Sequence, residues 1–85
     1  MDDNQKRMFK SVCRQIIDRQ RYVTKSDIEL ATDYVEARSR VAKLRTLLAT
    51  ESAETPEGSI RIVSLCSQIN ATTKLAQKIA RSLLL

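Results

Sequence analysis

Basic side chains that could neutralise phosphate groups follow one face of the first predicted helix. Lys6, Lys10 and Arg14 recur every four residues, with Arg7 beside them, in a chain whose formal net charge is +5 at pH 7. Such rows can track the phosphate backbone of nucleic acid, a contact that sets affinity and salt dependence rather than sequence choice. No aromatic residue shares their face of the helix, because Phe9 falls on its apolar stripe, so stacking on single-stranded bases is not expected. The sequence predicts weak, non-specific binding to double-stranded DNA.

Further basic residues lie in the second and third predicted helices. Two arginines of the second helix complete the predicted DNA-binding set, which is Lys6, Arg7, Lys10, Arg14, Arg38 and Arg45. A second basic row occurs near the C-terminus, at Lys74, Lys78 and Arg81. In the packing register described below, this row lies level with four acidic residues, Asp27, Glu29, Asp33 and Glu36. We therefore expect part of the C-terminal row to be neutralised within the chain.

The residues that enzymes use most often are scarce. The chain has no His, which excludes the catalytic dyads and triads that depend on one, and its single Gly provides no phosphate-cradling loop. Cys13 and Cys66 are too few and too far apart for a metal site or a disulfide framework, and both fall on apolar helix faces, so we expect buried, inert thiols. The prediction is a protein that is not an enzyme and has no cofactor or metal.

Helical periodicity and capping residues place these side chains on three helices of one domain, residues 1–85. The first helix is predicted at about 4–20. The second, at about 25–51, starts at Thr24 with Asp27 as a capping box, or at Ser26 with Glu29. A loop at 52–58 contains the only Pro and the only Gly, and the third helix, at about 59–84, is predicted to start at Ser59.

Two heptad patterns of apolar residues lie on either side of that loop. Folding the chain back at the loop brings Leu48 level with Ile62, Leu44 level with Leu65, and so on along both helices. The predicted fold class is therefore all-α: a short N-terminal helix plus a long antiparallel, coiled-coil-like helical hairpin. The two stripes are Leu30, Tyr34, Ala37, Val41, Leu44 and Leu48, and Ile62, Leu65, Ile69, Thr72, Ala76, Ile79 and Leu83.

Both long helices carry a second, flanking line of apolar or small residues that the short first helix is too short to cover. We predict that these flanks form the interface of a homo-oligomer. Two equivalent flanks would pair as a dimer, whereas contact between different flanks of successive subunits would close a ring. The predicted interface residues are Ile28, Val35 and Ala42 on the second helix, and Cys66, Thr73 and Ala80 on the third.

Compartment signals are absent from the sequence. No apolar run approaches the roughly 18 residues that a membrane-spanning helix needs. The first five residues, Met1 to Gln5, are acidic and polar, unlike a signal peptide. The expected compartment is the cytoplasm, without a membrane partner.

Several segments in this order resemble the small terminase subunit of tailed phages and phage-like gene transfer agents. The resemblance runs from about Met8 to the C-terminus: a basic and apolar first helix, the segment Val23-Thr24-Lys25-Ser26-Asp27, the segment Leu30 to Ala37, and a third helix that includes Lys78 to Leu83. It implies a non-catalytic, ring-forming component of a DNA-packaging motor, acting in the cytoplasm of a bacterial host. Its partners would be packaged DNA and the large terminase subunit, the ATPase and nuclease that it regulates.

Two other functions fit the same residues. One is a helical oligomeric adaptor or scaffold that assembles for another purpose. The other is a small basic DNA-associated regulator that acts as a dimer. Subunit number separates them, because a closed ring of many subunits favours the terminase function and a dimer favours the regulator.

Overall fold

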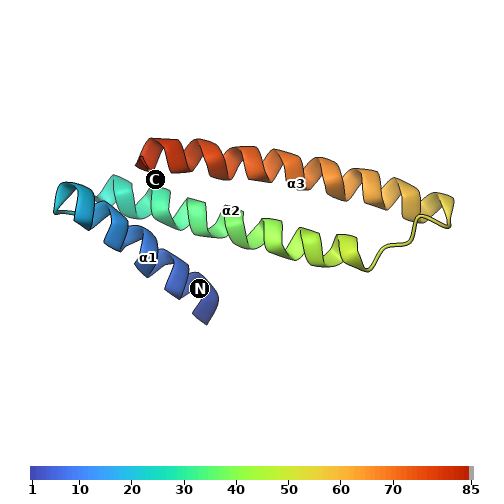
Figure 1. The fold of residues 1–85 in the computed structure, drawn as a ribbon, viewed down its shortest axis with the longest axis horizontal. Coiled ribbons are helices and arrows are strands. Elements are labelled where there is room, and N and C mark those ends of the chain that lie inside the picture. The colour runs from blue at the N-terminus through green and yellow to red at the C-terminus, as the bar shows by residue number, and fades with distance from the viewer. Residues whose placement is uncertain (85) are drawn as a thin grey trace.

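The computed structural model describes residues 1–84, and this part of the chain contains three α-helices and no strand. They are α1 (Asp3–Gln20), α2 (Lys25–Ala49) and α3 (Pro56–Leu83). The all-α fold class is confirmed. The molecule is elongated, with principal extents of 53 × 24 × 16 Å. Its long axis follows α2 and α3, which lie side by side and run in opposite directions (Figure 1).

Capping residues fix the corner between α1 and α2. α1 ends at Arg21, whose φ of 69° is left-handed. α2 then begins with the predicted capping box: the Thr24 hydroxyl accepts a hydrogen bond from the Asp27 N–H, and the Asp27 carboxylate accepts one from the Thr24 N–H. Gln20 adds a side-chain bond from Nε2 to Asp27 Oδ2 at 2.7 Å. The alternative start at Ser26 is not used.

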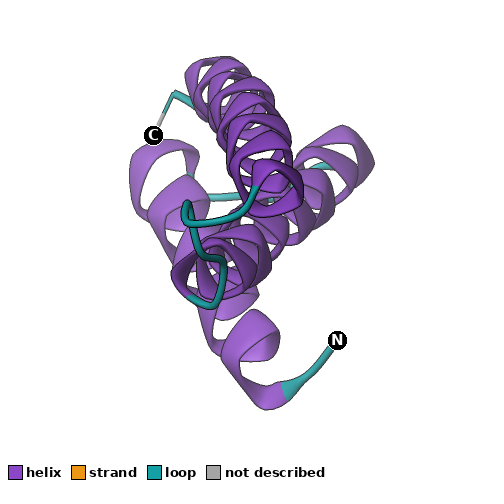
Figure 2. Ribbon diagram, turned by 90° about the vertical axis from the view of Figure 1, so that its right-hand side faces the viewer, coloured by secondary structure: helices purple, strands orange, loops and turns teal. Residues whose placement is uncertain are grey.

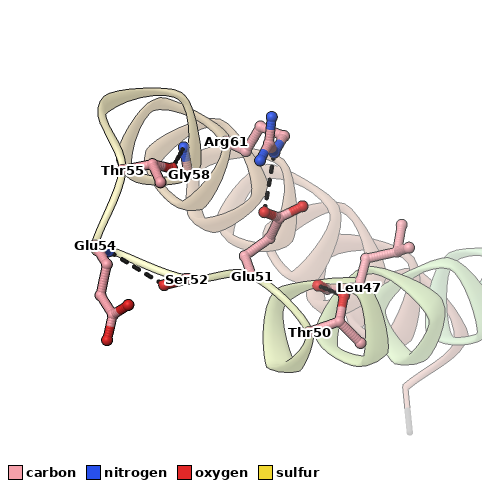
Figure 3. A network of polar contacts seen from close by, with 8 residues as sticks. All are labelled: Leu47, Thr50, Glu51, Ser52, Glu54, Thr55, Gly58 and Arg61. Carbon is pink, nitrogen blue, oxygen red and sulfur yellow. Dashed lines mark hydrogen bonds and ion pairs between the residues drawn. The ribbon is translucent and has the colours of Figure 1, made fainter.

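The start of α3 differs from the prediction by one turn. α3 begins at Pro56, with Thr55 as N-cap accepting a hydrogen bond from the Gly58 N–H, so Gly58 lies inside the helix and Ser59 is not the cap (Figure 3). Proline favours the first helical position because its fixed φ suits the helix and its missing N–H would be unpaired there anyway. Gly58 is needed for close approach, since a Cβ would lie 1.8 Å from the Ser52 carbonyl oxygen.

The interface between α2 and α3 is lined by the two predicted heptad stripes. Every residue of both stripes is buried or half-buried. The most deeply buried members come from both helices and include Ala37, Val41, Leu44, Ala76 and Leu83. Because the two stripes face each other along nearly the whole molecule, this seam is the longest continuous part of the core.

α1 adds a second, shorter core at one end of the molecule. It slants across the first half of α2, and its N-terminus points away from the other helices (Figures 1 and 2). Val12 and Ile16 of α1 pack in one cluster with Ala31 of α2 and with Ile79 and Leu83 of α3. All three helices therefore meet where α3 ends.

A side chain of α1 also closes the C-terminal end of α3. The Arg19 guanidinium donates hydrogen bonds to the backbone carbonyls of Leu83 and of Leu84, the latter at 2.9 Å. The last carbonyls of a helix have no partner within the helix, and a cation there also favours the negative end of the helix dipole. Arg19 thus ties the first helix to residues 64 and 65 positions later in the chain.

We predict that burial in the seam between α2 and α3 controls stability. Substitutions at two leucines of α2, one inside the seam and one outside it, test this prediction. Leu44 is 7% exposed and Leu47 is 54% exposed. Leu44→Ala should lower the free energy of unfolding by about 2–5 kcal/mol, because it leaves a cavity in the core. Leu47→Ala should change it by about 0.5 kcal/mol. Denaturant titration followed by circular dichroism measures both, and equal losses would contradict the packing described here.

The capping box at the corner between α1 and α2 should also make the free energy of unfolding depend on pH. The backbone N–H of Thr24 above all, and then its hydroxyl, hold the pKa of Asp27 below its usual value. The charged carboxylate therefore stabilises the fold above the usual aspartate pKa of about 4, and this contribution is lost as pH falls through the lower, folded-state pKa. The stability difference between wild type and Asp27→Asn should shrink when thermal melts are repeated below pH 4. Asp33→Asn, which removes an exposed carboxylate of the same helix that caps nothing, is the control for the loss of one negative charge.

Candidate functional site

The basic row of α1 lies on the face turned away from the core. Lys6, Arg7, Lys10 and Arg14 are all exposed. Arg7, Lys10 and Arg14 line one shallow depression together with Ser11. At 1.5 Å rise per residue, the four-residue spacing places successive charges about 6 Å apart along the helix. The capping box at Asp2 and Gln5 holds the first turn of this helix in place.

The two arginines predicted on α2 are exposed but do not belong to that depression. Arg45 lies on the second half of α2, beyond the segment that packs in the α1 core. Arg38 borders a separate, small cavity between α2 and α3. The structure therefore divides the predicted DNA-binding set into a continuous row on α1 and two separate positions on α2.

The C-terminal basic row is not neutralised as expected. Within residues 1–84 the structure has one ion pair, between Arg61 Nε and Glu51 Oε2 at 2.9 Å, and it lies at the loop between α2 and α3 (Figure 3). Lys74, Lys78 and Arg81 are exposed and free of ion pairs. The expectation failed because residues that are level along two packed helices can still point to different sides. These cations leave α3 with positive charge of its own.

The predicted oligomer interface is available only in part. Ile28 is 46% exposed, and Ala42 and Cys66 are exposed as well. Thr73 and Ala80 are half-buried in the wall of the cavity beside Arg38. Val35 is completely buried within the subunit, so its assignment to the interface is wrong. Val35 lies one helical turn after Ala31 on the same side of α2, and both side chains are fully buried.

The two cysteines have different surroundings. Cys13 is half-buried at the edge of the α1 core, where burial above all, and then the nearby Asp27 charge, raise the pKa of its thiol. Cys66 is exposed, so the prediction of a buried thiol is wrong there. Cys66 lies outside the α3 heptad stripe, and the buried cluster with α1 includes only Ile79 and Leu83 of that helix.

Two features of the surface were missed from the sequence. Ile60 and Val63, on the first turns of α3, are 70% and 69% exposed. Both stand outside the heptad stripe, and that position could have indicated their exposure. Arg19 was missed because nothing in the sequence near it indicates a partner at the other end of the chain.

Comparison with known proteins gives no match to a family model, to a curated protein or to a solved structure. None of the helices in the described part of the chain is long and apolar enough to cross a membrane. Among the same residues, no three or more acidic or cysteine side chains are grouped so that they could hold a metal ion.

The α1 row should contribute more to DNA binding than the basic row on α3. Lys10→Gln with Arg14→Gln should reduce the slope of log K against log salt by about 0.9 for each phosphate that the variant no longer neutralises. Fluorescence anisotropy with a duplex oligonucleotide at several salt concentrations measures this slope. The matched control is Lys74→Gln with Lys78→Gln, which removes the same charge. If both pairs reduced the slope equally, net charge rather than α1 would account for binding.

Proposed function

We propose that this protein is a non-catalytic small terminase subunit: an oligomer, assembled as a ring, that engages duplex DNA and regulates the large terminase ATPase and nuclease during genome packaging. The observation that carries the proposal is the exposed basic row on α1, which is free of ion pairs and separate from the apolar surface of α2 and α3. One subunit can therefore offer a phosphate-binding face and still use its other faces for assembly.

Several features support the DNA contact. The charges of the α1 row belong to one straight helix whose ends are both capped, so they are presented in a fixed order. Their neighbours in the depression include the Ser11 hydroxyl, which can also donate to a phosphate oxygen. Contacts of this kind to the phosphate backbone carry no sequence information, which is the behaviour expected of non-specific binding.

The assembly is supported by the apolar surface that remains on the subunit. α1 covers the first half of α2 and leaves the second half open, where Ala42 is exposed, while Ile28 remains exposed near the start of the helix. Ile60, Val63 and Cys66 are exposed on α3. The surfaces of α2 and α3 are different, and a contact between two different surfaces is heterologous, so repeating it closes a ring when the rotation permits.

Subunit number is the decisive measurement. Native mass spectrometry and multi-angle light scattering should give one closed oligomer of many subunits, which Ile28→Glu and Ala42→Glu should dissociate into helical subunits. Leu47→Glu is the matched control: it alters an exposed apolar residue of the same helix, but five positions from Ala42 and therefore on another side. Circular dichroism verifies that each variant remains folded.

Other outcomes separate the alternatives. A stable dimer that binds DNA would favour the small basic regulator. A ring without affinity for duplex DNA would favour the adaptor or scaffold. A monomer at all micromolar concentrations would contradict the ring and the terminase function together.

A further inference from the structure

A small cavity lies between α2 and α3, on the side where Arg38 emerges. Its volume is about 90 Å³. For comparison, a water molecule occupies about 30 Å³ in the liquid. We call this cavity the Arg38 pocket, and its lining residues are Tyr34, Arg38, Thr73, Ala76, Gln77 and Ala80.

One residue that lines the Arg38 pocket, Thr73, has a hydroxyl group without a partner. Thr73 Oγ1 is buried and makes no hydrogen bond. A threonine inside a helix can bond to the carbonyl four residues earlier, as Thr32 does with Ile28 at 2.8 Å and Thr46 does with Ala42 at 3.0 Å. Thr73 forgoes this bond, and a buried hydroxyl without a partner is costly. Its hydrogen-bonding capacity is thus left for a group that enters the pocket.

The chemistry of the lining favours an anion. Arg38 is exposed and has no acidic side chain within ion-pair distance. The Gln77 amide and the Tyr34 hydroxyl can each donate a hydrogen bond. No carboxylate lines the pocket. The cavity on the other side of the α2–α3 pair is different, because Asp33 and Glu36 line it beside Arg40. Of these two cavities, only the Arg38 pocket combines a cation and neutral donors with a lining that has no carboxylate.

We propose that the Arg38 pocket binds one phosphate group. The guanidinium of Arg38 supplies charge-assisted hydrogen bonds, and Thr73 and Gln77 donate to the remaining oxygens. Inorganic phosphate and a backbone phosphate of duplex DNA share this chemistry. The idea that DNA supplies this phosphate group rests on the proposed function. The phosphate site itself does not rest on it.

The test is an NMR titration of the labelled protein with inorganic phosphate, against sodium chloride at equal ionic strength. Phosphate should shift the amide signals of Thr73 and Gln77, whereas chloride should not. Arg38→Gln should weaken phosphate binding about tenfold or more, because it removes a charge-assisted bond. The matched control, Arg40→Gln, removes the same charge from the acidic side of the pair and should leave the affinity within twofold.

A second variant tests the pocket without changing its charge, in case Arg38 attracts phosphate only through long-range electrostatics. Thr73→Val keeps the shape and removes the unpartnered hydroxyl. It should raise the melting temperature of the free protein and weaken phosphate binding several-fold. Thr72→Val, at the adjacent position in the opposite cavity, is the control and should not weaken binding. Equal effects of Arg38→Gln and Arg40→Gln, or unchanged phosphate affinity in Thr73→Val, would overturn the proposal.

A titration with duplex DNA then identifies the source. If DNA shifts the same amides and Arg38→Gln lowers the salt dependence of DNA binding, the pocket takes a backbone phosphate. If only inorganic phosphate shifts them, the pocket is a phosphate site that does not contact DNA, which leaves the phosphate proposal standing and removes Arg38 from the DNA-binding set. Loss of the ring alone would contradict the proposed function and leave the pocket unaffected.

Discussion

The apolar seam between α2 and α3 is the interaction on which the rest of the molecule depends. No disulfide joins the described residues, and their single ion pair is exposed at the loop, so cohesion comes from burying apolar side chains. A seam of two helices is only one layer thick, and each helix keeps most of its circumference in solvent. Functional surfaces are therefore distributed along the length of the molecule instead of being gathered in one deep cavity.

The position of α1 follows from that seam and decides which surfaces remain open. α1 completes a three-helix core only at the end where Ile79 and Leu83 lie, and Arg19 fastens it there. Beyond that end α2 and α3 have no third layer. The same attachment turns the opposite face of α1, with Lys10 and Arg14, toward solvent. Packing at one end thus creates both a basic face and a long uncovered pair of helices.

Much of this could be predicted from the sequence because it depends on local chemistry. The heptad stripes, the cap at Thr24 and the exposed basic row follow from spacing and residue type. The N-cap at Thr55 is also a local feature, since Pro56 favours the first helical position, but Ser59 is a competing cap residue four positions later. Arg19 could not be placed because its partners, the carbonyls of Leu83 and Leu84, are 64 and 65 residues away in the sequence. The burial of Val35 could not be placed because it depends on what packs against its side of α2. Helical periodicity fixes which side a residue occupies, not what covers it.

The distribution of charge around the α2–α3 pair gives the subunit two chemically different sides. The cavity beside Arg38 has a cation and neutral donors, whereas the opposite cavity contains Asp33 and Glu36 as well as Arg40. A uniform surface with the net charge of this chain, +5, would attract DNA in any orientation. Phosphate contacts at fixed positions instead determine how a protein lies on the duplex, even where they carry no sequence information. On the proposed function, the cation row of α1 and the Arg38 pocket would both face the duplex, while the side of the pair that carries Asp33 and Glu36 would be repelled by it. The subunit would then meet DNA in one orientation, and in the proposed ring, where every subunit repeats that orientation, such contacts would add up without any of them reading a base.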